Sequence, residues 1–248
     1  TEALRTLRAR ILPATIGTLP GASYAVTGGT AGSADSNALL KRSWPRVFAF
    51  VLTFAFLLLL VSFRSLVIAA KAILLNLLSV CAAYGVLVAA FQYGWAESIL
   101  GFRSNGGIAS WLPIFMFVIL FGLSMDYHVF ILSRIREAFD RGLTTEDAVA
   151  HGIMTTAGVV TSAALVMVGV FSIFITLPIL DVKQAGFGLA VAVLIDATIV
   201  RAVLLPATMK LLGDWNWYLP RWLNWLPELE HTEKPPFTRA LASGPSWR

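Results

Sequence analysis

Residues 121–130 read FGLSMDYHVF and place one acid, Asp126, inside a long apolar stretch, since no residue from 104 to 125 is charged. A second acid, Asp196, interrupts the apolar run LIDAT at residues 194–198. A carboxylate well inside a bilayer costs at least about 2.5 kcal/mol on insertion scales, and such groups usually mark proton relays, ion paths or ligand sites. The two acids therefore predict membrane-spanning helices with a chemical role inside the membrane.

The composition fits a lipid-embedded chain, with 57% hydrophobic and 13% charged residues and a mean hydropathy of +0.76. The net charge of +5 comes from lysines and arginines in loops and tail, which are typical of membrane anchors and do not indicate nucleic-acid binding. A single cysteine, Cys81, can form neither an internal disulfide nor a metal cage, and we expect a small buried residue there.

Five stretches are long and apolar enough to span a membrane, which takes about 20 residues. The predicted fold is therefore an all-α membrane protein. We expect a transmembrane domain over residues 45–212, followed by an aromatic-rich tail at 213–248. Tryptophans mark the predicted span edges, as interfacial aromatics do. The predicted spans are residues 46–63, 66–91, 110–133, 153–177 and 184–205.

Basic residues predict the orientation, because cytoplasmic loops carry an excess of Lys and Arg. One side has Arg134, Arg136, Arg141, Lys210, Arg221, Lys234 and Arg239, whereas the opposite short loops carry only Arg103 and Lys183. The C-terminal tail is thus expected in the cytoplasm and the N-terminal segment outside. Basic residues in that segment do not change the prediction, since long extracytoplasmic domains translocate largely regardless of charge.

Residues 1–44 are expected to be the end of an extracytoplasmic domain in α-β-α order. Residues 4–11 have one apolar helical face, Ala22–Thr27 alternates like a strand, and Asp35–Ser43 leads helically into the first span. Some forty residues are too few to bury a core, so we expect them to pack on further sequence. In the cytoplasmic loop, Thr144 and Asp147 resemble a capping box that starts a helix running into the fourth span.

The two acids are predicted to lie at similar depth. Asp126 lies thirteen residues after Pro113 and Asp196 thirteen after Lys183, in spans that run in the same direction. Small residues accompany both acids, and such residues let membrane helices approach closely. We therefore expect both carboxylates to face the bundle interior. The small residues are Gly122, Gly158, Ser162, Gly169, Gly188 and Ala192.

Neighbouring polar residues extend this candidate site. Tyr127 is offset by about 100° from Asp126, and Arg201 lies about 140° around the helix from Asp196, which argues against a direct pair within that helix. Arg201 is either an interfacial anchor or a relay partner. Both acids could instead be packing staples, and Tyr127 a packing residue. His128 lies on the face opposite Asp126, and His151 has no metal-ligand spacing around it.

Several motifs, in this order, are similar to the large mycobacterial-type membrane protein (MMPL) family, exporters of lipids and natural products in the resistance-nodulation-division (RND) superfamily. The resemblance covers nearly the whole chain. The motifs are FGLSMDY at 121–127, SRIRE at 133–137, TTEDAVAHG at 144–152, LIDATIVR at 194–201, LPA at 205–207 and NWYLP at 216–220.

This resemblance implies twelve helices in two pseudo-symmetric halves, of which the chain resembles the last five. It implies a proton relay, with Asp126 and Tyr127 as the second-half pair and Asp196 and Arg201 as further charged positions. The implied function is export of a lipid or hydrophobic natural product across the bacterial plasma membrane, driven by the proton gradient and without a cofactor, metal or enzymatic step. The implied partners are membrane lipids, a lipid-like substrate and the missing N-terminal half, and a homo-oligomer is compatible with it.

Two other functions use similar residues. A non-transporting lipid- or sterol-sensing relative of the superfamily would keep the bundle without gradient-dependent substrate movement. An intramembrane aspartyl protease also places two acids at one depth, but it would need a Gly-x-Gly-Asp motif, and Asp126 follows GLSM. No Gly-rich phosphate loop supports an ATP-driven pump in this stretch of sequence.

Overall fold

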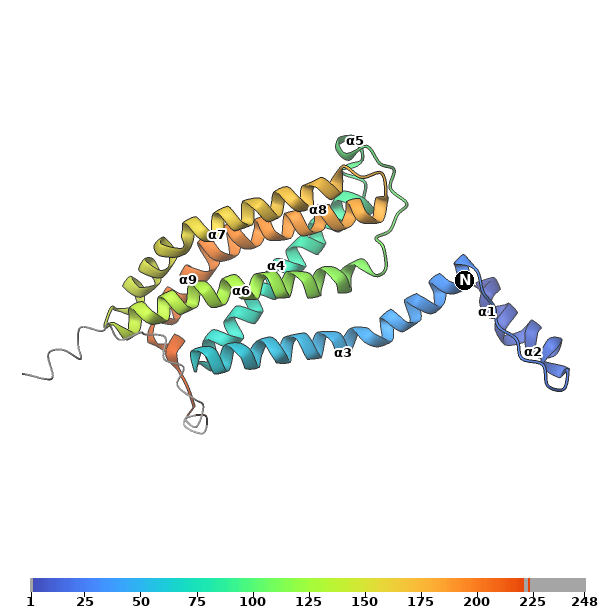
Figure 1. The fold of residues 1–248 in the computed structure, drawn as a ribbon, viewed down its shortest axis with the longest axis horizontal. Coiled ribbons are helices and arrows are strands. Elements are labelled where there is room, and N and C mark those ends of the chain that lie inside the picture. The colour runs from blue at the N-terminus through green and yellow to red at the C-terminus, as the bar shows by residue number, and fades with distance from the viewer. Residues whose placement is uncertain (1, 221–222, 224–248) are drawn as a thin grey trace, which may run out of the picture.

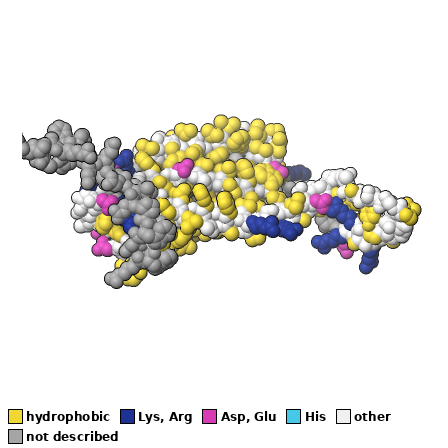
Figure 2. Space-filling view, turned by 60° about the horizontal axis from the view of Figure 1, so that its bottom comes forward, with side chains coloured by type: hydrophobic (Ala, Val, Ile, Leu, Met, Phe, Trp, Pro, Cys, Tyr) yellow, Lys and Arg dark blue, Asp and Glu magenta, His cyan; other side chains and the backbone are white. Residues whose placement is uncertain are grey.

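The computed structural model describes residues 2–220 and residue 223. The described chain is helical and holds no strand, and five of its helices are long and apolar enough to cross a membrane. These helices run side by side as a bundle, with the N-terminal segment projecting from one end (Figure 1). Figure 2 shows apolar side chains covering the flank of the bundle, with charged residues mainly toward its ends. The structure thus confirms the predicted all-α membrane fold.

The N-terminal segment consists of short helical turns, α1 (Glu2–Thr6), η1 (Leu7–Ile11), α2 (Leu12–Ala14) and η2 (Ile16–Thr18). The predicted strand over residues 22–27 is wrong: the segment is irregular, because no second extended segment in the described chain pairs with its backbone. Arg8 instead connects this segment to the start of the first long helix, because it donates to the Val26 carbonyl (3.1 Å) and to both carboxylate oxygens of Asp35 (2.5 and 2.8 Å).

The first spanning helix, α3 (Gly29–Phe63), begins well before the predicted span. It bends along its length (Figure 1), and Pro45 lies inside it, where a proline removes a backbone hydrogen bond and kinks a helix. Beyond the bend, Phe48 stacks on Phe117 with ring centroids 3.9 Å apart, which attaches α3 to α6 (Leu112–Asp140).

The second span comprises α4 (Leu66–Leu87) and η3 (Val88–Gln92), and a short helix, α5 (Glu97–Leu100), follows it. Ser65 caps α4 by accepting a hydrogen bond from the amide of Ile68 at 3.1 Å. Cys81 on this span is exposed, contrary to the sequence expectation. A small apolar residue on a lipid-facing helix needs no protein cover, so its type does not predict burial.

The fourth span, α7 (Thr145–Ile175), has the predicted cap, since the Thr144 hydroxyl accepts from the amide of Asp147 at 3.2 Å. It runs without a break from the loop into the bundle, as expected. A Cβ at Gly152 would lie 2.4 Å from a side-chain atom of Ile135 and 2.9 Å from its backbone nitrogen, so only glycine allows this contact between α7 and α6.

The last span joins α8 (Leu180–Ile195), a nine-residue π-helical segment η4 (Asp196–Leu204), α9 (Leu205–Leu212) and the turn η5 (Gly213–Trp217). Gly188 on α8 packs tightly against Met116, as the small-residue pattern predicted. By contrast, a Cβ at Gly122, Gly158 or Gly169 would meet nothing within 4 Å, so these glycines do not mark helix contacts in the described chain.

The turn η5 closes one end of the bundle. Lys71 on α4 donates to Asn216 Oδ1 at 2.9 Å, and Asn216 is fully buried. Trp217 stacks on Phe139 with centroids 4.4 Å apart, and the Arg136 guanidinium lies 4.8 Å from the Trp217 ring centroid. Two further tryptophans shortly after the predicted last span, Trp222 and Trp225, lie outside the described residues.

Candidate functional site: a polar cluster inside the bundle

The centre of the site is an ion pair on the last span. Arg201 donates through one terminal nitrogen to Asp196 Oδ2 at 2.5 Å, and both residues are buried, at 4% and 8% exposure. The sequence prediction that these residues would not pair is wrong. In an α-helix, residues five apart lie about 140° apart, but in a π-helix the backbone hydrogen bonds run from i to i+5 and each turn holds more residues, so the two side chains come much closer to one face. The pair therefore depends on the π-helical segment η4.

The pair is joined to α6 by Ser124. Its hydroxyl donates to the same Asp196 oxygen at 2.5 Å, while Arg201 donates to the Ser124 carbonyl at 3.2 Å. These contacts lie two residues from Asp126, which supports the predicted equal depth of the two acids. Because further hydrogen bonds offset the cost of burying an ion pair, Ser124 belongs to the site, although sequence reasoning did not single it out.

Tyr127 lies against this pair. Its ring centroid is 4.5 Å from the Arg201 guanidinium carbon, which is a cation–π distance, and its hydroxyl lies 3.5 Å from the sulfur of Met167 on α7. The aromatic ring thus covers one side of the guanidinium. The structure brings together three of the four predicted site residues, namely Tyr127, Asp196 and Arg201.

Asp126 points elsewhere. It is exposed in the described chain and forms no hydrogen bond or ion pair there, so the expectation that both acids face the bundle interior is wrong for Asp126. The reason is the helical repeat: Asp126 follows Val118 and Gly122 at four-residue spacing on the exposed face of α6, whereas Ser124 and Met125 lie on its buried face. Gly122, one turn away, is also exposed.

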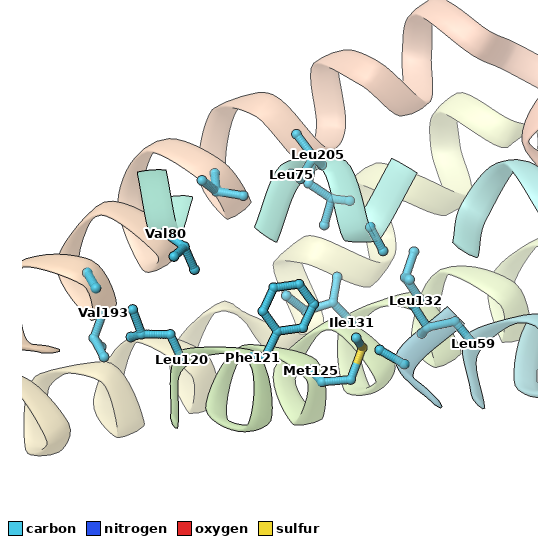
Figure 3. Packing of buried hydrophobic residues seen from close by; sticks show 14 of the residues in the cluster. Leu59, Leu75, Val80, Leu120, Phe121, Met125, Ile131, Leu132, Val193 and Leu205 are labelled. Carbon is cyan, nitrogen blue, oxygen red and sulfur yellow. The ribbon is translucent and has the colours of Figure 1, made fainter. Parts of the chain in front are cut away.

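A small cavity of about 10 Å³, close to the least volume that holds one water molecule, lies beside the pair. Its wall includes Leu120 and Val193, whose side chains lie next to one another in Figure 3. Asn76 on α4 also faces this cavity; it is 1% exposed, and neither its amide nitrogen nor its amide oxygen has a partner in the described chain. Asp196 Oδ1 and Arg201 Nε are likewise unpaired there.

Asn76 is therefore a second site residue that sequence reasoning missed. The available signal was an amide in the apolar run KAILLNLLSV at residues 71–80, because uncompensated polar groups inside a membrane are costly. His128 lies on the inner face of α6, with Nδ1 3.1 Å from the Ser124 carbonyl. It thus contacts a member of the cluster, although it does not line the cavity. The described residues include no group of three or more His, Cys, Asp or Glu that could hold a metal ion.

Comparison with known proteins gives the family. The model of the MMPL family matches residues 2–232. The chain belongs to the MMPL family. Its MMPL relatives include the mycolic acid-containing lipids exporter MmpL11 of Mycolicibacterium smegmatis, which is 47% identical over 235 residues, or 94% of the chain and 24% of the relative. The chain therefore spans about a quarter of that relative's length.

Other MMPL relatives differ in their described roles. The trehalose monomycolate exporter MmpL3 of M. smegmatis is 38% identical over 72% of the chain and 18% of its own length. The haem uptake protein MmpL11 of Mycobacterium tuberculosis is 48% identical over 80% of the chain and 20% of its own length. These relatives are named as lipid exporters or for haem uptake, and with five apolar helices among its described residues the chain is a multi-pass membrane protein of the MMPL family.

Chemically, the cluster combines one buried carboxylate, one guanidinium, a hydroxyl and an aromatic ring. The positive and negative charges of the pair cancel, which lowers the cost of keeping them inside the membrane. Asp126, one residue from Tyr127, has no such compensation in the described chain.

Proposed function

We propose that this chain is the C-terminal part of an exporter of lipids or hydrophobic natural products in the bacterial plasma membrane, driven by the proton gradient. In this proposal Asp126 accepts and releases the proton, and Tyr127, Asp196 and Arg201 transmit the change to the helices. The observation that carries the proposal is the contrast between the two acids. Asp196 forms a buried ion pair with Arg201 inside the bundle, whereas Asp126, expected at a similar depth, is exposed and unpaired in the described chain.

The open face of α6 supports a two-part relay. A charged carboxylate halfway along an apolar helix is costly when it faces lipid, so it is expected to meet a polar partner on another helix. Gly122 lies one turn away and leaves room for such a helix. We propose that the missing N-terminal half supplies that partner, and that the five described spans do not transport alone. Assembly of the complete protein into a homo-oligomer stays a separate proposal.

The proposed coupling follows from electrostatics. Protonation of Asp126 removes its charge and changes which hydrogen bonds it prefers, and this shifts the balance between two packings of the surrounding helices. Tyr127 connects that face to Arg201 through the 4.5 Å ring contact, and Ser124 connects α6 to Asp196. A proton bound on the outer face of α6 can thus alter the contact of α6 with the last span.

The cargo class comes from the relatives. Two of them are named as exporters of mycolic acid-containing lipids and of trehalose monomycolate, which supports a lipid-like cargo. A relative of similar identity is named for haem uptake, so haem is the second cargo to test. We further propose that the N-terminal segment lies outside the cell and the C-terminal tail inside, on the strength of the basic-residue asymmetry.

The decisive experiment is Asp126→Asn in the full-length protein, assayed in proteoliposomes with an imposed pH gradient and a lipid cargo. Asparagine keeps the size and much of the hydrogen bonding but cannot lose a proton, so gradient-driven export should be abolished with nearly unchanged abundance. Asp140→Asn is the matched control, because Asp140 is a partly exposed acid at the end of the same helix, bonded to Arg136. Export by the Asp126 variant at the wild-type rate would refute the relay, and loss of folded protein in this variant alone would favour a structural staple.

A further inference from the structure

A groove between α6 and α7 lies outside the relay cluster, which consists of Ser124, Tyr127, Asp196 and Arg201. It encloses about 380 Å³, and its walls combine apolar and basic residues. The apolar residues are Phe130, Ala138 and Val159, the arginines are Arg134 and Arg141, and the lining is completed by Glu137, His151 and Thr155. The close contact of Gly152 with Ile135 holds the two helices together beside this groove. The relay cluster uses none of these residues.

The charges in the groove do not cancel. Glu137 alone accepts from both arginines, from Arg134 at 2.9 Å and from Arg141 at 2.5 Å. Two guanidinium groups on one carboxylate leave an excess of one positive charge. The arginine side chains are 51% and 56% exposed, and each uses one nitrogen on Glu137, so further N–H donors of both guanidinium groups remain for a ligand. Arginine forks of this kind suit phosphate oxygens.

The depth of these residues matches the edge of a bilayer. Asp126 is fourteen residues from either end of α6, at its midpoint. Phe130 then lies about 6 Å and Arg134 about 12 Å from the middle of the helix, and half the hydrocarbon core is about 15 Å thick. The apolar part of the groove is thus at acyl-chain level, and the arginines are at the edge of the hydrocarbon core and in the headgroup region.

We propose that this groove binds an anionic phospholipid, with the phosphate between Arg134 and Arg141 and an acyl chain along Phe130 and Val159. A free phosphate ion would use the arginines but not the apolar wall, and Val159 is 57% exposed on that wall. The excess positive charge selects an anionic headgroup over a zwitterionic one. The site is separate from the proton relay, so it does not depend on the proposed transport mechanism.

The test is lipid binding by the purified full-length protein, measured by native mass spectrometry with phosphatidylglycerol and, in parallel, phosphatidylcholine. Phosphatidylglycerol should bind preferentially, and the double variant Arg134→Gln/Arg141→Gln should weaken its binding by about 10- to 30-fold, since each basic residue contributes on the order of 1 kcal/mol at such surfaces. Arg136→Gln is the matched control, because Arg136 is on the same helix but contacts Asp140 and Trp217. It should bind as the wild type does.

A variant that binds the lipid more tightly distinguishes a specific effect on the groove from misfolding of the protein. Glu137→Gln removes the one acid between the two arginines, so it should tighten phosphatidylglycerol binding several-fold, and a damaged protein would not produce that result. Millimolar inorganic phosphate should fail to displace the lipid. The proposal is overturned if the Arg136 variant weakens binding equally or if the protein shows no preference for the anionic lipid. It is also overturned if the Glu137 variant binds phosphatidylglycerol more weakly or if inorganic phosphate readily displaces the lipid.

Discussion

The ion pair between Asp196 and Arg201 permits a sharp test by double-mutant cycle. Asp196→Asn leaves a guanidinium at 4% exposure without its counter-charge, and Arg201→Met leaves the carboxylate alone. Two unit charges about 4 Å apart attract by about 4 kcal/mol at an effective dielectric constant near 20. Breaking a buried pair from one side typically costs about 3–5 kcal/mol. Each single variant should therefore lose about 3 kcal/mol or more of unfolding free energy.

The double variant Asp196→Asn/Arg201→Met should lose less than the sum of the two single variants, by at least about 2 kcal/mol, because no uncompensated charge is left. The assay is reversible unfolding of the full-length protein in mixed micelles with increasing SDS, followed by tryptophan fluorescence. All three variants should also fail in gradient-driven export if the pair transmits the relay. If the two losses add to within about 0.5 kcal/mol, the residues are not coupled and the interpretation of the η4 geometry is wrong.

Three further predictions address the site, the packing and the topology. Asn76→Leu should retain the folded protein but shift the pH profile of export, because it removes the amide that faces the cavity beside the ion pair. Asn76→Asp should keep part of the export activity. An unchanged pH profile in the leucine variant would exclude Asn76 from the site. Gly152→Ala should destabilise the protein by about 1–3 kcal/mol through overpacking. The matched control Gly158→Ala, with nothing within 4 Å of its Cβ, should be neutral or stabilise the protein by up to about 1 kcal/mol in the same SDS titration, because alanine favours a helix over glycine. In a background without the native cysteine, labelling of single cysteines should place Asn105 outside and Asp147 inside, and labelling of both from one side would contradict the proposed orientation.

Much of the fold follows from local pattern. Apolar runs of membrane-spanning length predicted five helices, and five helices among the described residues are long and apolar enough to cross a membrane. Thr144 predicted the start of α7, because a cap depends only on residues within one turn. The N-terminal strand could not be predicted correctly in the same way, because a strand requires a partner and alternation alone does not supply one.

The candidate site likewise has some features that local sequence predicts and others that depend on tertiary contacts. The spacing indicated that Asp126 and Asp196 lie at similar depth, since rise per residue is nearly constant along a helix, and it marked Tyr127 and Arg201 as neighbouring polar residues. The sequence did not correctly predict which of these side chains point into the bundle. Only the tertiary structure shows that Asp196 and Arg201 pair, since the pair requires a π-helical segment that the one-dimensional pattern does not reveal.

The sequence by itself determined the class of the molecule and its long apolar helices, and it predicted a similar depth for Asp126 and Asp196, because hydropathy and helical rise are local properties. Tertiary structure alone decided which of those residues meet. Asn76 comes from α4, and its position beside the ion pair depends on how three helices pack. Asp126 faces outward for the same reason: rotation of a helix about its axis is set by the neighbours it packs against, and these are distant in sequence.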